Sequence, residues 1–380
     1  MIMEEEFKSA AEQFELSGRI VSAIPFGNGN INSTILVETE IPEDGTHRKY
    51  ILQSINTEIF KNPQALMNNI VQVTSYLKEQ ISLGGGNPDR ETLTPVRTKD
   101  GEWLYCDLRG KCWRMYLFIT DAVCLDQSES SEQFYETGAA FGHFQYLLRG
   151  FPVENLYEVL PDFHHTPKRF QALEHAVTYG NRERCDEAYE EISFCMQRKS
   201  EAGMIAEGLR TGVLPLRVTH NDTKLSNIML DKYSRKGICV IDLDTVMPGS
   251  VLYDYADAIR SGANTAQEDE TDLSRVNCSL ELFEAFTRGF WEGCRGILTK
   301  EEVELFVRAA WTITLEQAVR FLSDYLMDDV YYRIRHPKHN LERTRNQLKL
   351  VADIEAKWSE LEQIVNRVTS DELYAVRDDE

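Results

Sequence analysis

The strongest constraint on this chain is a polar motif enclosed by short apolar stretches. It runs from His220 through Asp222 to Asn227 with the spacing H-x-D-x-x-x-x-N. A β-type run at 237–241 follows and ends in an acid, Asp242. Either feature alone is common in loops and turns, but the two together, 20 residues apart (242 − 222), are hard to explain by structure alone. The pattern indicates a reaction site.

Phosphoryl transfer is the chemistry that suits these side chains. The reaction needs an acceptor held in line and neutralised charge on the phosphate oxygens. We expect Asp222 to orient the acceptor hydroxyl and accept its proton late, with Lys224 near the transferring group. Asn227 and Asp242 offer the oxygen ligands that Mg²⁺ prefers. His220 is expected to shape the loop through hydrogen bonds rather than to move the proton.

Composition favours an ordinary globular protein. Of the 380 residues, 42 % are hydrophobic and 27 % are charged. No apolar run reaches the roughly 18 residues that span a membrane, and the acidic start lacks the features of a secretory signal. The eight cysteines are dispersed without a C-x-x-C pair, which favours reduced thiols. These features predict a cytoplasmic protein without membrane contact.

The formal net charge of −21 argues against nonspecific nucleic-acid binding. Phosphate contacts of that kind need clustered Lys and Arg side chains. Any phosphate handled here is therefore held locally, by backbone amides, a few basic side chains or a divalent cation. The expected partners are a nucleotide and a small-molecule acceptor.

The pattern along the chain predicts two lobes. Strand-like stretches dominate the first third, with one helix that begins at Asn62-Pro63, a favourable cap and first residue. Beyond a hinge near 119–122 the chain is mostly helical. We therefore predict an N-terminal nucleotide-binding lobe, 1–120, and a C-terminal lobe, 121–380, with the catalytic and acceptor-binding loops. The predicted strands are 19–24, 33–38, 49–55, 102–107 and 111–119.

Segment 219–244 resembles the catalytic and metal-binding loops of the aminoglycoside phosphotransferase and choline kinase superfamily. This resemblance implies an α+β, bilobal protein-kinase-like fold, with a small antiparallel β-sheet lobe, one main helix and a larger, mainly helical lobe. The chain is also similar to one branch, the N-acetylhexosamine 1-kinases. That similarity lies in segments 50–56, 60–63, 220–227, 241–249, 254–262 and 320–325.

Members of that branch phosphorylate the anomeric hydroxyl of N-acetylglucosamine or N-acetylgalactosamine with ATP and Mg²⁺. Carried over by position, the resemblance makes Asp222 the catalytic base and Asn227 and Asp242 metal ligands. Asp244 is a further candidate for the metal or its surroundings. ATP and Mg²⁺ are therefore the expected cofactors.

Nucleotide contacts in the N-terminal lobe are assigned to a loop and to one strand residue. The loop consists of Gly27, Asn28, Gly29 and Asn30, whose backbone N–H groups suit phosphate, although an ordinary hairpin turn is the alternative. Gln53, on the strand at 49–55, is the remaining candidate.

A protein kinase carries a Lys on its third strand paired with a Glu on the next helix. Here the only strand lysine is Lys49, at the edge, and the helix has a single acid, Glu79, near its far end. The ion pair is therefore not identifiable. Its absence keeps open a pseudokinase that binds nucleotide without turnover.

Candidate acceptor-binding residues are polar or amphipathic side chains within apolar stretches, namely Arg114, Arg320, Asp324 and Tyr325. Arg320 and Asp324 are four residues apart, so a simple helical salt bridge is the alternative. The motif at 220–227 also fits a choline, homoserine or aminoglycoside kinase, which leaves the acceptor open.

Overall fold

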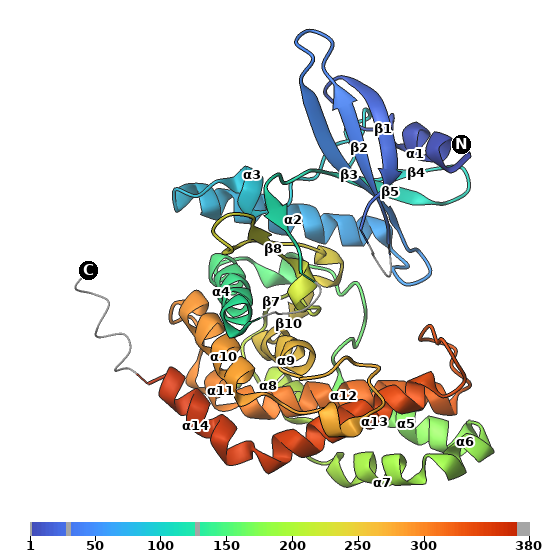
Figure 1. Ribbon diagram of the computed structural model, residues 1–380, viewed down its shortest axis with the longest axis vertical. Coiled ribbons are helices and arrows are strands. Elements are labelled where there is room, and N and C mark those ends of the chain that lie inside the picture. The colour runs from blue at the N-terminus through green and yellow to red at the C-terminus, as the bar shows by residue number, and fades with distance from the viewer. Residues whose placement is uncertain (1, 28–31, 126–129, 371–380) are drawn as a thin grey trace.

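The computed structural model describes residues 2–27, 32–125 and 130–370, and it has two parts (Figure 1). A five-stranded antiparallel sheet with the order β1-β2-β3-β5-β4 forms the N-terminal lobe. Its strands are β1 (Arg19–Pro25), β2 (Ser33–Glu40), β3 (His47–Ile55), β4 (Tyr105–Cys106) and β5 (Cys112–Leu117). The helices of this part are α1 (Ile2–Ala11), α2 (Pro63–Leu83) and α3 (Pro88–Glu91).

The sheet forms because its strands alternate between a buried and a more exposed face. Ile35 and Val37 of β2 are buried, and so is Leu52 of the paired strand β3. These side chains join Phe14 and Trp113 in a hydrophobic cluster that is separate from the core of the larger lobe. The small lobe therefore has a core of its own.

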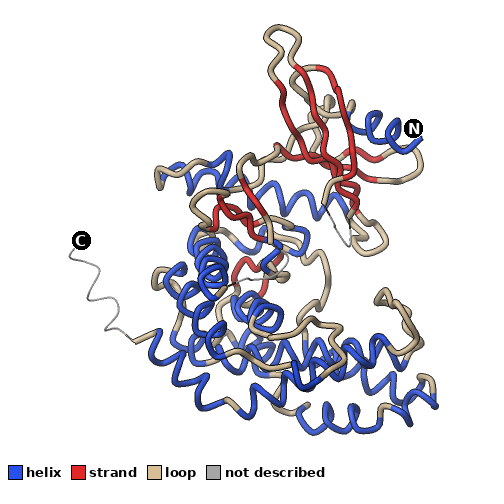
Figure 2. Tube along the Cα trace, in the orientation of Figure 1, coloured by secondary structure: helices blue, strands red, loops and turns tan. Residues whose placement is uncertain are grey.

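Helix α2 connects the small lobe to the large one. It begins after Asn62, whose side chain caps a backbone N–H at 3.0 Å. Its buried residues, such as Leu66 and Ile70, belong to the core of the larger lobe. The Asn69 side chain also donates a hydrogen bond to the carbonyl of Val246 at 2.9 Å. Figure 2 shows this helix between the sheet and the helical part.

Short β-ladders position the polar loops of the larger lobe. One ladder pairs β7 (Arg217–Thr219) with β10 (Met247–Gly249), and the other has the order β6-β8-β9. Strands of the second ladder are β6 (Ala122–Val123), β8 (Ile228–Asp231) and β9 (Gly237–Val240). The single turns of 3-10 helix are η1 (Val153–Asn155), η2 (Leu225–Asn227), η3 (Leu243–Thr245) and η4 (Leu273–Arg275).

Helices surround these ladders. Helices α4 and α10 pack closely because glycines face the partner backbone: a Cβ added at Gly289 would lie 2.1 Å from the carbonyl oxygen of Tyr135. Among the described residues, no helix is long and apolar enough to cross a membrane. The helices are α4 (Ser131–Leu147), α5 (Thr166–Tyr179), α6 (Arg182–Glu187), α7 (Tyr189–Arg198), α8 (Met204–Thr211), α9 (Val251–Gly262), α10 (Leu280–Cys294), α11 (Lys300–Glu304), α12 (Phe306–Leu326), α13 (His339–Ala356) and α14 (Trp358–Val368).

Two cysteines of the small lobe form a disulfide. Cys106 and Cys112 are directly opposite in the β4–β5 ladder, with Cα atoms 4.0 Å apart. The expectation of reduced thiols is wrong for this pair, because the dispersed spacing does not reveal that the hairpin register brings them together. Buried thiols are found at Cys185, Cys195, Cys239, Cys278 and Cys294.

Candidate active site

A buried carboxylate on α9 holds the loop that follows β7. The Asp254 side chain is 1 % exposed and accepts the backbone N–H groups of His220 at 2.9 Å and Asn221 at 2.7 Å. It also accepts a hydrogen bond from the Gln145 side chain at 2.7 Å. Burial raises the pKa of Asp254, while the hydrogen bonds from the two backbone N–H groups and from Gln145 favour its charged form. Sequence reasoning gave Asp254 no role, although an acid within the apolar run Val251–Ile259 was the available signal.

His220 connects this loop to the strand that precedes Asp242. Its ring is buried, and Nε2 donates to the carbonyl of Ile241 at 2.8 Å. Nδ1 accepts the backbone N–H of Asp222 at 3.2 Å. These two bonds describe a neutral imidazole with its proton on Nε2, facing a carbonyl rather than a substrate. The His220 side chain therefore supports the loop.

Three predicted residues meet directly in the loop. Lys224 Nζ donates to Asp222 Oδ2 at 2.8 Å, and Asn227 Nδ2 donates to the same oxygen at 3.0 Å. A further bond from Asn227 Nδ2 to the Asp222 carbonyl measures 2.8 Å. Although burial disfavours its ammonium charge, the Asp222 carboxylate raises the pKa of Lys224. The amide nitrogen of Asn227 is thus engaged, which leaves its side-chain oxygen for a cation.

Asp242 lies close to this group at the end of β9. Its backbone is left-handed, with φ 60° and ψ 54°, a conformation that Asp tolerates better than most residues. Its carboxylate has no hydrogen bond or ion pair with the described residues. Burial, together with the nearby charges of Asp244 and Asp222, raises the pKa of Asp242 to about 6. A bound cation would relieve this unfavourable burial of negative charge.

The donor set fits a hard divalent cation. Asn227 and Asp242 are brought close by a backbone bond from Ile241 N to the Asn227 carbonyl, at 2.9 Å. Among the described residues there is no cluster of three or more His, Cys, Asp or Glu side chains that suits a metal. Mg²⁺ in nucleotide sites is typically held by one or two carboxylates together with substrate phosphates. The arrangement thus suits Mg²⁺ bound with a nucleotide.

Asp244 faces the small lobe. Its side chain forms a buried ion pair with the Arg114 guanidinium of β5, and its second oxygen accepts from Asn32 Nδ2 at 2.6 Å. Arg114 Nε in turn donates to Gln53 Oε1 at 3.0 Å, across the β3–β5 ladder. Burial disfavours the Arg114 charge, but Asp244 raises the pKa of the guanidinium. Both Asp244 oxygens are therefore engaged by residues of the sheet and of the segment before β2.

The predicted phosphate loop is only partly described. Gly27 follows β1 with φ 71°, a conformation that favours glycine. Asn28, Gly29 and Asn30 lie outside the described residues. Gln53 contacts Arg114, as given above, and donates to Thr34 Oγ1 at 3.1 Å.

A pocket of about 160 Å³ lies beside Asp222. Two of its acids are already paired: Asp257 contacts Arg260 at 2.9 Å, and Glu316 accepts from His164 Nδ1 at 2.9 Å. Arg320 lies over aromatic rings, and no carboxylate of the described chain is within ion-pair distance of it. The pocket is lined by Phe163, His164, Asn221, Asp222, Asp257, Arg260, Ile313, Glu316, Gln317, Arg320 and Tyr332.

Of the four predicted acceptor residues, the structure brings only Arg320 to this pocket. Arg114 lies in the small lobe with Asp244. Tyr325 donates its hydroxyl to Glu187 at 2.7 Å. Asp324 accepts backbone N–H groups of the loop after α12, so the alternative helical salt bridge with Arg320 does not form.

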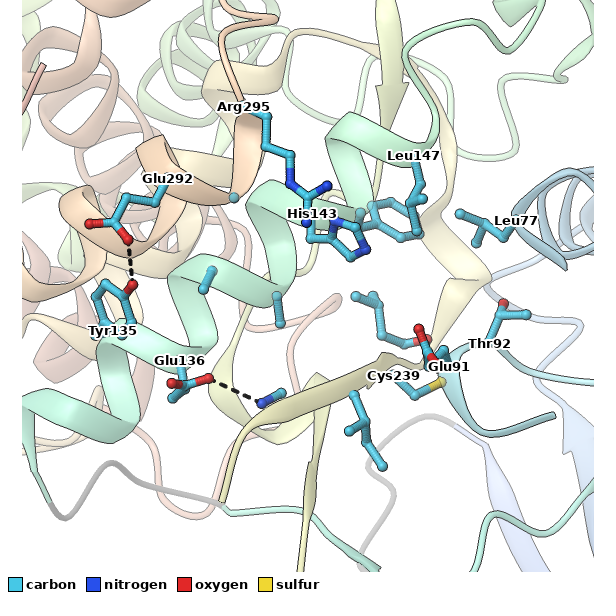
Figure 3. A pocket seen from close by; sticks show the side chains of 17 residues that line it. Leu77, Glu91, Thr92, Tyr135, Glu136, His143, Leu147, Cys239, Glu292 and Arg295 are labelled. Carbon is cyan, nitrogen blue, oxygen red and sulfur yellow. Dashed lines mark hydrogen bonds between the residues drawn. The ribbon is translucent and has the colours of Figure 1, made fainter. Parts of the chain in front are cut away.

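A second cavity, of about 400 Å³, lies between α4, β9 and α10 (Figure 3). Tyr135 donates its hydroxyl to Glu292 at 2.6 Å, and Glu136 accepts the backbone N–H of Gly237 at 3.4 Å. None of the residues predicted to act in catalysis or binding lines this cavity. Of the predicted site residues, Asp222 and Arg320 line the smaller pocket instead.

Solved structures that superpose on this chain include several kinases and phosphotransferases. A microcompartment-associated aminopropanol kinase superposes with a TM-score of 0.61 at 15 % identity, covering 93 % of this chain and 97 % of that one. A spectinomycin phosphotransferase in complex with ADP and spectinomycin gives 0.56 at 14 %, with coverages of 94 % and 98 %. A choline kinase from Cryptosporidium parvum Iowa II gives 0.53 at 11 %, with coverages of 90 % and 91 %. The expected bilobal protein-kinase-like fold is confirmed.

The model of the phosphotransferase enzyme family, APH, matches residues 22–277. This match covers more than half of the chain. The protein belongs to the phosphotransferase enzyme family.

Proposed function

We propose that this protein is an ATP- and Mg²⁺-dependent N-acetylhexosamine 1-kinase, which transfers phosphate to the anomeric hydroxyl of N-acetylglucosamine or N-acetylgalactosamine. The observation that carries the choice of acceptor is the charge balance of the pocket beside Asp222. Its acids Asp257 and Glu316 are paired, whereas the cation of Arg320 has no carboxylate partner in the described chain. Such a pocket disfavours an ammonium group and favours an uncharged, oxygen-rich acceptor.

The other lining residues support a sugar. Phe163, Ile313 and Tyr332 supply apolar and aromatic surface for a ring and a methyl group. Gln317 and Arg320 supply hydrogen-bond donors for hydroxyl or carbonyl oxygens. The sequence similarity to the sugar kinase branch in segments 254–262 and 320–325 points the same way.

The proposed transfer follows from the positions of the loop side chains. Asp222 orients the C1 hydroxyl and takes its proton as the new oxygen–phosphorus bond forms and the bond to ADP breaks. Lys224 and Asn227 hold the Asp222 carboxylate, and Lys224 places positive charge near the transferring group. Asn227 and Asp242 would hold Mg²⁺, which when bound neutralises charge on the nucleotide phosphates. Asp244 acts through its contact with Arg114.

Nucleotide contacts from the small lobe are assigned to the loop at 27–30 and to Gln53, whose side chain contacts Arg114. Asn32, two residues beyond that loop, reaches Asp244 and also accepts the backbone N–H of Asn56 at 3.0 Å. Asn32 therefore links the segment before β2 to Asp244, two residues beyond the proposed metal ligand Asp242. A cytoplasmic location is part of this proposal, because ATP is supplied there.

A coupled assay of ADP release across a panel of acceptors tests the proposal. The panel contains N-acetylglucosamine, N-acetylgalactosamine, glucose, choline, homoserine, aminopropanol and an aminoglycoside. We expect turnover of the two N-acetylhexosamines and none of choline or aminopropanol. Turnover of a cationic acceptor without turnover of either N-acetylhexosamine would replace the proposal by an amino-alcohol or aminoglycoside kinase. Nucleotide binding without any turnover would indicate a pseudokinase.

A further inference from the structure

The loop between α12 and α13 forms one wall of the pocket beside Asp222. Tyr332 of this loop lines the pocket, and its ring lies 4.7 Å from the ring of Phe321, measured between centroids. Its hydroxyl accepts a hydrogen bond from Gln317 at 3.4 Å. The Arg320 guanidinium lies 5.8 Å from the centroid of the same ring. The position of the Tyr332 ring therefore determines the shape of the pocket and the environment of the Arg320 guanidinium.

Asp324, near the C-terminal end of α12, holds the backbone of this wall. Its side chain is 6 % exposed. Oδ1 accepts the backbone N–H of Tyr331 at 2.8 Å, and Oδ2 accepts that of Tyr332 at 2.9 Å. The Asn340 side chain of α13 donates to the same Oδ2 at 2.9 Å. One carboxylate thus fixes two consecutive loop residues and the start of the next helix.

The path of the loop depends on this anchor. Asp328 and Asp329 both have left-handed backbone, with φ 65° and 58°, so the chain reverses sharply after α12. The Asp329 N–H bonds the carbonyl of Asp324 at 2.8 Å, and its carboxylate contacts Arg184 at 2.5 Å and Asn340 at 2.8 Å. These contacts fix the beginning of the reversal, whereas the Asp324 carboxylate fixes its end.

We infer that Asp324 is a positioning residue for the acceptor: by holding the backbone at 331–332, it keeps the Tyr332 ring beside Arg320 and so sets the affinity for the acceptor. The inference rests on the proposed function only in taking the pocket beside Asp222 as the acceptor site. A carboxylate suits this task because both of its oxygens accept N–H groups. An amide would turn its NH₂ group toward one of those donors.

Steady-state kinetics of Asp324→Asn test the inference, with N-acetylglucosamine as the acceptor. We expect the KM for the acceptor to rise about tenfold, while kcat and the KM for ATP stay within about twofold of wild type. Asp328→Asn is the matched control, because it removes the same charge from the same loop at an exposed position and Asn tolerates the left-handed backbone. Its three kinetic constants are expected to equal those of wild type.

Tyr332→Leu separates positioning from a general loss of structure. This variant should reproduce the rise in acceptor KM, and adding Asp324→Asn to it should change that KM little further, because both act through one side chain. An unchanged acceptor KM in Tyr332→Leu overturns the inference, whether or not Asp324→Asn folds. If the KM for the acceptor and the KM for ATP rise equally in a folded Asp324→Asn enzyme, the inference is also overturned.

The proposed function is tested separately, by the acceptors that the wild-type enzyme turns over. If wild type turns over choline or aminopropanol but not N-acetylglucosamine, the proposed function fails and the same variants are measured with that acceptor. A selective rise in its KM still supports the positioning role. If the wild-type enzyme turns over no acceptor in the panel, both the proposed function and the inference about Asp324 are overturned.

Discussion

Arg114 and Asp244 form a buried ion pair that joins the small sheet to the segment after β9. Their side chains are 1 % and 5 % exposed, and they are 130 residues apart in the sequence. Asp244 lies two residues beyond Asp242, the proposed metal ligand. The basic side chain that reaches the segment after β9 from the sheet therefore comes from β5, and Gln53 of β3 contacts it.

Breaking this pair should destabilise the fold strongly. Arg114→Met leaves the Asp244 charge buried without its cation, which typically costs about 3–5 kcal/mol. Arg19→Ala is the control, because the Arg19–Glu40 pair is exposed and should contribute little to stability. Urea unfolding gives both values. Equal losses of stability in the two variants would contradict a structural role for the buried pair.

Asp222→Asn should abolish transfer while leaving nucleotide binding largely intact. The amide keeps the shape of the side chain but cannot accept the hydroxyl proton, and general base catalysis typically contributes about 10²- to 10⁴-fold. Single-turnover kinetics measure the loss, and calorimetry measures Mg–ATP binding. Activity equal to that of wild type would remove Asp222 from the role of base.

Affinity for Mg–ATP should depend on pH through Asp242. Its pKa is raised to about 6, so the carboxylate is charged at pH 8 and increasingly protonated below 6. Because only the charged form binds the cation well, affinity should fall as pH decreases from 7 to 5. The Asp242→Asn variant should bind Mg–ATP weakly at every pH, and its affinity should not show the pH dependence that comes from Asp242. Parallel pH profiles of wild type and variant would exclude Asp242 as the metal ligand.

The glycine contact between α4 and α10 should tolerate no methyl group. In Gly289→Ala the new Cβ would lie 2.1 Å from a backbone oxygen of α4, so the helices must separate and the enzyme should lose about 1–3 kcal/mol or more. Gly84→Ala is the control, since its nearest contacts are at 3.5 Å and its φ is negative. A thermal midpoint for Gly289→Ala equal to that of Gly84→Ala would show that the packing adapts.

Local patterns were sufficient to predict the two lobes and the polar loop at 220–227, whereas the fold class came from the family resemblance. The strands at 19–24, 33–38 and 49–55 appear as β1, β2 and β3, and the helix begins at Pro63 as its cap predicts. The side chains of Asp222, Lys224 and Asn227 meet because only a few residues of loop separate them.

Long-range contacts were not predictable from spacing. No residue near Arg114 in the sequence indicates that its side chain contacts Asp244. Likewise, the sequence does not show that the hydroxyl of Tyr325, in the apolar helix α12, donates to Glu187 on α6. Asp254 lies in the segment of similarity at 254–262, but only the structure shows that its carboxylate holds the backbone of His220 and Asn221. The loop between α12 and α13 forms one wall of the pocket beside Asp222. Its path depends on the Asp324 carboxylate and on a chain reversal after α12, which only the folded chain reveals.

The most direct test of the proposed 1-kinase activity identifies the oxygen atom to which the phosphate is transferred. Incubation of the enzyme with Mg–ATP and N-acetylglucosamine, followed by ³¹P and ¹H nuclear magnetic resonance, identifies the phosphorylated oxygen. The account predicts a sugar 1-phosphate, with coupling between phosphorus and the anomeric proton, and no such product with Asp222→Asn. Phosphate on any other hydroxyl, or no sugar phosphate alongside rapid phosphorylation of choline or aminopropanol, would contradict it.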